Sequence, residues 1–216
     1  MEIIGPRYYP HKELLARYSP YFRAAFTGKL KEGVEKGYPL TIEDTSPESS
    51  EQFLEWRYTQ SDLASRILEN LGLTEVQLVN LYILGDRYEI PRLRKHSLEA
   101  LHAYCGIEEV MPCTLAIQEA FLHLPETSNL CRYTIDRFIH FHEFGGDAYR
   151  DKRDGFIQRY TTLPGNFLAR TMFGYRDKLA RSNIPLGGTW DDGVLKRYVE
   201  DDDDESEQAS KRQKTS

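Results

Sequence analysis

The segment that begins at Thr74 constrains the fold more than any other part of the chain. Thr74 and Gln77 form a capping box, in which the two side chains satisfy backbone N–H groups at the start of a helix. The helix that follows carries apolar residues on nearly every face, namely Val76, Leu78, Val79, Leu81, Ile83 and Leu84. A helix that is apolar all round is a buried helix. We therefore expect this helix to lie at the centre of the core.

Two serine–proline pairs predict further helix starts ahead of this segment. Ser19 with Pro20, and Ser46 with Pro47, each combine an N-cap residue with a proline that suits the first helical turn. A short helical segment from Pro10 precedes the first pair. The apolar residues of the three predicted helices are Leu14, Leu15, Tyr21, Phe22, Ala25, Phe26, Phe53, Leu54, Trp56 and Tyr58.

Between the two pairs the apolar period changes from that of a helix to that of a strand. Leu40 and Ile42 alternate with Thr41 and Glu43, which is typical of a half-buried strand. After the central helix, Ile90 and Pro91 mark a break and a helical stripe follows. The sequence thus predicts a first unit of helices on a small sheet, which closes near residue 105.

The second part of the chain is helical by pattern and ends in a charged tail. Two apolar stripes lie between residues 108 and 144, and Pro164 opens a last helix. Gly187 and Gly188 precede an acidic run, so we expect disorder after about Arg197. We place the domain boundaries at 1–107, 108–181 for the helical extension, and 182–216 for the linker and the disordered acidic and basic tail.

Charge and cysteine content exclude several classes of protein. The segment 200–216 holds seven acids and three bases, so it carries −4 of the net charge of −6 and leaves no basic field for nucleic acid. No apolar run approaches the ~20 residues of a membrane-spanning helix. The three cysteines, Cys105, Cys113 and Cys131, follow no secretory segment, so we interpret them as reduced thiols of an intracellular protein, cytoplasmic or nuclear.

The first region resembles a BTB/POZ domain, and more closely the BTB/POZ proteins of filamentous fungi. The resemblance rests on the order and spacing of short pieces such as the string from Ser19 to Phe26 and the block from Leu81 to Leu93. Each piece alone is weak, but together they are fairly specific. The family-motif residues are His11, Ser19, Pro20, Phe22, Phe26, Gly33, Phe53, Trp56, Tyr58, Asp86 and Tyr88.

The resemblance implies an α+β fold shared with elongin C, in which helices flank a small sheet. Only Met1 to Pro10 stand ahead of His11, so the domain is shortened at its N-terminus or the gene model is truncated. A leading helix that many family members use to form homodimers is missing, which puts homo-oligomerisation in doubt. Arg57 stands where the family usually has an apolar residue, and we expect its stem to pack while its head reaches water.

No set of residues predicts an enzyme, a metal site or a cofactor site. His140 and His142 lie on different faces of a helix, so they cannot readily share one metal ion. His102, Cys105 and nearby Cys113 could provide three metal ligands, but the sequence offers no fourth. A cation such as Arg132 beside Cys131 favours the thiolate and would lower the pKa of the thiol. We favour the simpler interpretation, in which Cys131 is a small apolar residue on a helical stripe. An enzyme using Cys131, His140 and His142 therefore stays only as a third hypothesis.

The resemblance implies an adaptor that binds protein partners, one class being a cullin scaffold of a ubiquitin ligase. The alternative is a nuclear regulatory or scaffold protein that uses this region for self-association or corepressor binding and its acidic tail for contact. Deletion of residues 200–216 separates the two, because only the alternative loses its partners. Lys211, Arg212 and Lys214 form a small basic cluster that also fits a nuclear import signal.

Overall fold

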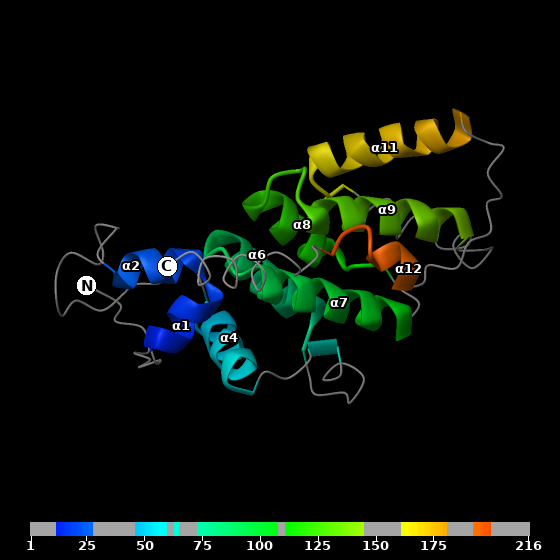
Figure 1. Cartoon of the computed structure of the whole chain (residues 1–216). Coiled ribbons are helices and arrows are strands. Elements are labelled where there is room, and N and C mark those ends of the chain that lie inside the picture. Colours follow the sequence, from blue (N-terminus) through cyan, green and yellow to red (C-terminus); the bar gives the residue numbers. More distant parts are fainter. Residues whose placement is uncertain are drawn as a thin grey trace, which may run out of the picture.

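A computed structural model of the chain describes residues 12–27, 46–59, 63–64, 73–107, 111–144, 161–180 and 192–199. The structural statements below concern these residues. Their secondary structure is helical (Figure 1). The named helices are α1 (Lys12–Tyr18), α2 (Pro20–Phe26), α4 (Pro47–Thr59), α6 (Glu75–Arg87), α7 (Pro91–Ile107), α8 (Thr114–His123), α9 (Asn129–Phe144), α11 (Gly165–Ala180) and α12 (Asp192–Leu195).

The predicted α+β architecture is wrong, because the described residues contain helices and no strand. The alternating stretch from Leu40 to Glu43, on which the strand prediction rested, lies outside the described residues. Every described segment with a strong apolar pattern has the helical period, and its apolar face is buried against other helices. The described part of the chain is therefore an assembly of helices. The tail that we expect after Val199 lies outside the described residues.

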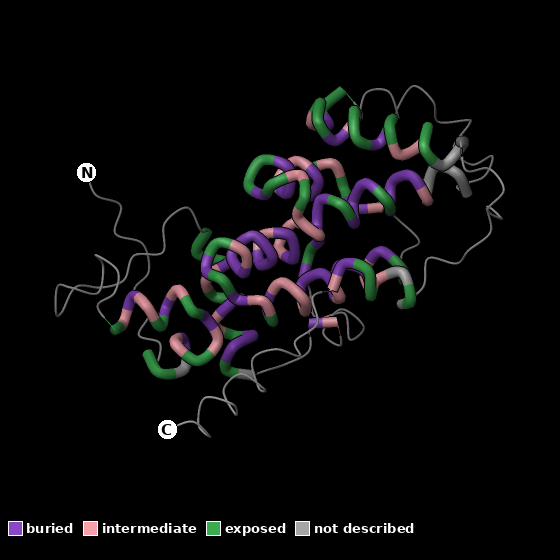
Figure 2. The backbone as a smooth tube through the Cα atoms, turned by 45° about the horizontal axis from the view of Figure 1, so that its top comes forward, coloured by how far each residue is buried: buried purple, intermediate pink, exposed green. Residues whose placement is uncertain are grey.

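Helix α6 occupies the centre of this assembly, as its sequence predicted. Its capping box is present: the Gln77 backbone N–H donates to Thr74 Oγ1 at 3.3 Å, and the Thr74 N–H donates to Gln77 Oε1 at 2.8 Å. The helix packs against α4, α7 and α8 (Figure 1). Because it has neighbours on several sides, most of its residues are buried, and Figure 2 shows buried positions around the turns of the central helices.

The two predicted helical regions share one core. Helix α8 packs on α6, and α9 packs on both α8 and α11. The Glu75 carboxylate at the start of α6 accepts a hydrogen bond from the Cys113 backbone N–H at 2.9 Å, which ties the start of α8 to α6. A single cluster of buried apolar residues extends from Leu15 to Tyr198. The predicted helical extension therefore packs against the first region and shares its hydrophobic core.

Helix α11 approaches α9 closely at Gly174. A Cβ atom at this position would lie 2.5 Å from Ile139 Cδ1, closer than side-chain atoms can pack. The small residue thus allows the two helices to come together at the edge of the molecule. Among the described helices, none combines the length and the apolar character that crossing a membrane requires.

Candidate protein interface

Most of the described motif residues form the scaffold rather than an exposed surface. Ser19 is fully buried; its Oγ accepts from the Phe22 backbone N–H at 3.0 Å and donates to the Tyr88 carbonyl at 2.5 Å. The Phe22 ring stacks on Tyr88 at 5.3 Å and on Phe26 at 6.1 Å. We call Ser19, Phe22, Phe26 and Tyr88 the aromatic cluster. It fastens α2 to the C-terminal end of α6.

The remaining motif residues divide between core and surface. Asp86 accepts a hydrogen bond from Arg94 on α7 at 3.0 Å, which joins the end of α6 to α7. Phe53 is buried, whereas Tyr58 is 51% exposed. Pro20 is exposed as the first residue of α2, and His11 and Gly33 lie outside the described residues.

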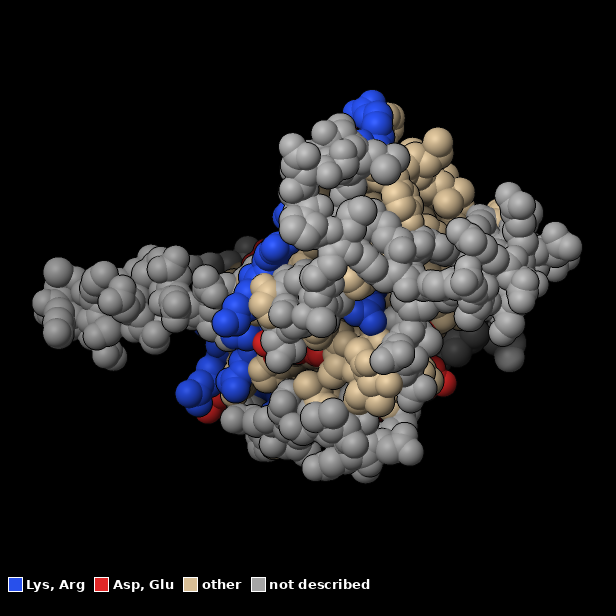
Figure 3. Space-filling model, turned by 90° about the vertical axis from the view of Figure 1, so that its right-hand side faces the viewer, with Lys and Arg blue, Asp and Glu red and all other residues tan. Residues whose placement is uncertain are grey.

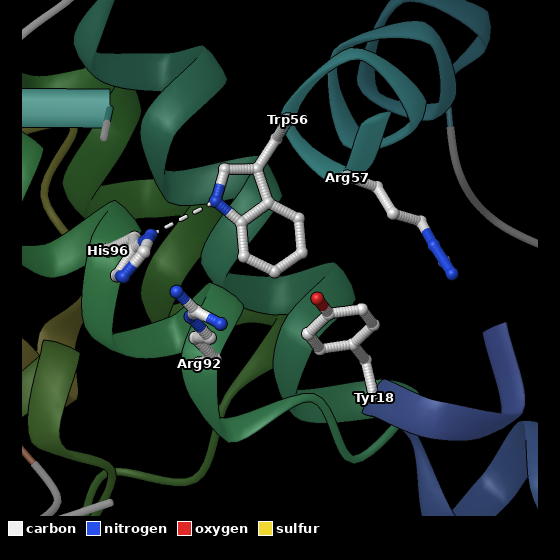
Figure 4. A pocket seen from close by; sticks show the side chains of 5 residues that line it. All are labelled: Tyr18, Trp56, Arg57, Arg92 and His96. Carbon is white, nitrogen blue, oxygen red and sulfur yellow. Dashed lines mark hydrogen bonds between the residues drawn. The ribbon is translucent and has the colours of Figure 1, made fainter. Parts of the chain in front are cut away.

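Trp56 forms the wall of a small pocket between α1, α4 and α7 (Figure 4). Tyr18, Arg57, Arg92 and His96 line it with the indole. The indole N–H donates to His96 Nδ1 at 3.1 Å, and the Tyr18 ring meets the indole edge-on at 6.3 Å. The pocket holds about 10 Å³, roughly one water molecule, so it is a packing defect rather than a ligand site.

Arg57 corrects the expectation that its head reaches water. The residue is only 3% exposed, and its guanidinium lies over the Tyr18 ring at 5.2 Å, on the side away from His96 (Figure 4). Within the described part of the chain, none of its three guanidinium nitrogens has a hydrogen-bond partner. Burial lowers the pKa of Arg57 below its usual range, because removal of water disfavours the charged form. The cation–π contact with Tyr18 replaces part of the lost hydration.

A larger hollow of about 180 Å³ lies where α4, α6 and α8 meet. Its lining is mixed and comes from both predicted regions: Ser46, Ser49, Asn80, Ile83, Leu84, Arg87, Glu119 and His123. We call it the α6–α8 hollow. Two serines form its rim at the start of α4, where Ser46 Oγ accepts from the Ser49 backbone N–H at 3.1 Å and donates to the Ser49 hydroxyl at 3.0 Å.

The opposite rim of the hollow belongs to α8 and carries charge. His123 Nε2 lies 3.5 Å from Glu119 Oε2, one helical turn away on the same face. Leu122 and Leu115 are seven residues apart on α8 and are 73% and 52% exposed. At about 100° per residue, they lie roughly 60° or less around the helix from Glu119. An exposed apolar strip therefore borders the polar hollow, which is the composition of a protein interface with a polar recess.

The cysteines are not activated nucleophiles. Burial raises the pKa of Cys105 to about 12 and the pKa of Cys131 to about 11, so both thiols stay protonated at neutral pH. Burial also raises the pKa of Cys113 to about 11, and its bond with Glu75 acts in the same direction. At Cys131 the desolvation outweighs any attraction to Arg132. Within the described residues, no three His, Cys, Asp or Glu side chains gather as a metal site.

Sequence reasoning missed the α6–α8 hollow. Asn80 and Arg87 are seven residues apart on a largely apolar helix and lie on one face of it, where a polar surface could have been expected. Their partners on α4 and α8 are more than 30 positions away in sequence. No spacing rule brings Ser46 and His123 together, because their proximity depends on how the helices pack.

Comparison with known proteins finds similarity in the first region of the chain. Residues 2–104 match the BTB/POZ domain. Kelch-like protein 40 from Xenopus tropicalis is 28% identical over 93 residues, which cover 43% of this chain and 13% of that protein. The chain thus corresponds to a small part of the length of this relative. No solved structure matches the chain.

Proposed function

We propose that this protein is an adaptor that binds protein partners and has no catalytic activity of its own. The match of residues 2–104 to the BTB/POZ domain carries the proposal, and the similarity to a Kelch-like protein supports it. The raised thiol pKa values argue in the same direction, since the cysteines lack the ionisation that a nucleophile needs. One partner is a cullin scaffold of a ubiquitin ligase, as the family resemblance implies.

The α6–α8 hollow and the leucine strip beside it are the surface through which we expect this partner to bind. The hollow is smaller than the roughly 300–1,000 Å³ of small-molecule sites, but it can take one side chain of a partner. Leu115 and Leu122 then bury their exposed area against the partner, which supplies the apolar part of the binding energy. The combination of a specific recess and an apolar strip favours recognition of a folded protein surface.

The chain offers a matched pair of variants for testing this surface. Leu122 on α8 and Met172 on α11 are both 73% exposed, so neither substitution opens the core. Tagged full-length protein is recovered from its native cells, and the cullin that accompanies it is quantified. We expect Leu122→Asp to lower cullin recovery at least tenfold and Met172→Asp to leave it unchanged.

Two results contradict parts of this proposal separately. Absence of any cullin with the unaltered protein, where a known BTB adaptor recovers one, excludes the cullin as partner. Equal cullin recovery with Leu122→Asp and with the unaltered protein excludes the leucine strip as its contact. An Asn80→Trp variant, which fills the hollow from α6, then tests whether the recess itself is used.

A further inference from the structure

A short segment near the C-terminus is fastened to α9 by one aromatic side chain. Helix α12 is four residues long and continues into a turn, in which the Tyr198 backbone N–H donates to the Leu195 carbonyl at 2.9 Å. Tyr198 is only 4% exposed, and Leu195 is partly buried against the core. Figure 1 shows the segment in orange beside α9 and α7. A helix this short has no stability of its own, so side-chain contacts hold it.

Three residues of α9 form the place where Tyr198 binds. The Tyr198 hydroxyl donates to Asp136 Oδ2 at 2.5 Å, and the two rings of Tyr198 and Tyr133 meet edge-to-face at 5.7 Å. The Arg132 guanidinium lies over the Tyr198 ring at 6.0 Å. We call Arg132, Tyr133 and Asp136 the tyrosine seat. It offers a ring contact, a hydrogen-bond acceptor and a cation to one incoming tyrosine.

Contacts with α7 hold the residues of the tyrosine seat in place. The Tyr133 side chain is fully buried, and its hydroxyl lies 3.4 Å from His102 Nδ1. The Arg137 guanidinium donates to the Cys105 carbonyl at 2.7 Å. Because α7 and α9 are thus joined beneath the seat, its geometry does not depend on the segment that occupies it. A preformed surface of this kind can bind a ligand reversibly without rearranging.

The sequence around Tyr198 supplies charge that complements the seat. Lys196 and Arg197 precede it and are exposed, and an acidic run from Glu200 to Glu205 begins two residues after it. Lys and Arg side chains also gather along one margin of the face shown in Figure 3, where few acidic side chains are visible. A tyrosine followed by acidic residues matches the ring contact that Tyr133 offers and the positive charge of Arg132.

We propose that the tyrosine seat is a docking site for peptide segments in which a tyrosine precedes acidic residues, and that residues 195–199 occupy it as an internal ligand. The proposal does not depend on the adaptor function or on a cullin. A partner segment with the same pattern displaces the internal one, because a second tyrosine can make the same ring contact and hydrogen bond that Tyr198 makes with the seat. The seat is then a second interaction surface, built from other residues than the α6–α8 hollow.

Peptide binding to the full-length chain tests this proposal directly. The probe is a fluorescent peptide with the sequence of residues 192–207, and binding is measured by fluorescence anisotropy at fixed ionic strength. In the Tyr198→Ala chain the internal ligand loses its anchor, so we expect it to bind the probe at least tenfold more tightly than the unaltered chain. A probe that carries Tyr198→Ala should bind the same variant chain at least tenfold more weakly than the parent probe.

Further variants separate the seat from general charge attraction and from misfolding. Adding Asp136→Ala to the Tyr198→Ala chain should abolish the gain in probe binding, while circular dichroism confirms that the helices remain. Equal affinity of the folded variant for both probes would overturn the proposal, since charge alone would then explain binding. A dimer of the unaltered chain that dissociates on Tyr198→Ala would also overturn it, because the segment would be exchanged between two copies.

Discussion

The aromatic cluster and the tyrosine seat both fasten a distant segment of the chain, but they differ in how many groups do so. At the end of α6, Tyr88 contacts two rings of α2, Phe22 and Tyr21, and its carbonyl accepts from the buried Ser19 hydroxyl. The described contacts of the seat with its segment converge on the ring and the hydroxyl of Tyr198, and Leu195 adds one partly buried side chain. We therefore expect α2 to be a permanent part of the core, and the segment at the tyrosine seat to detach more easily because fewer side chains hold it.

The first prediction tests this contrast by truncating one ring in each place. Phe22→Ala removes a fully buried ring from the aromatic cluster, and we expect a loss of about 3–5 kcal/mol in the free energy of unfolding. Tyr198→Ala should cost less than half of that, because its segment can detach while the core persists. Urea denaturation followed by circular dichroism measures both. Equal losses would mean that residues 192–199 belong to the cooperative core, and the contrast would fail.

Much of the scaffold could be predicted because its signals are local. The N-cap at Ser19 and the capping box at Thr74 each involve residues three positions apart, and both are present as predicted. The central position of α6 followed from apolar residues on nearly all its faces. Such patterns reflect the backbone and the nearest helical turn, which the sequence specifies directly.

The interaction surfaces could not be predicted in the same way because they depend on packing. Tyr198 lies 62 positions from Asp136, and the expected disorder after about Arg197 gave no reason to pair them. The α6–α8 hollow likewise combines three helices. The sheet prediction was wrong for a different reason: it relied on a family resemblance and one alternating stretch, and the described residues contain only helices.

The second prediction concerns Arg57, where the scaffold itself departs from what its sequence suggested. The buried guanidinium has no hydrogen-bond partner among the residues that the structure describes, and the Tyr18 ring only partly replaces its lost hydration. We expect Arg57→Leu to stabilise the protein by about 1–3 kcal/mol, since leucine fills the space without a charge. Thermal unfolding measures the change, with the exposed Arg17→Leu as a control near zero. A destabilised Arg57→Leu protein would indicate that the cation has an unrecognised anionic partner.

The third and smallest prediction uses the pH dependence of stability at Cys131 on α9, the helix that carries the tyrosine seat. Its pKa is raised to about 11 in the folded protein, mainly by burial, whereas an unfolded thiol ionises near pH ~8.5. Between these values the unfolded state binds fewer protons, so the stability contributed by the protonated thiol falls as pH rises. The destabilisation caused by Cys131→Ala should therefore shrink by about 1 kcal/mol between pH 7.5 and 9.5.

Denaturant unfolding of both proteins at the two pH values gives this difference, and titrations common to both cancel. The opposite sign would be informative. If Arg132 instead lowered the pKa of Cys131, the folded state would release its proton first, and the cost of Cys131→Ala would grow with pH. That result would restore the hypothesis of a reactive thiol on α9 and would weaken the interpretation of this region as a binding surface alone.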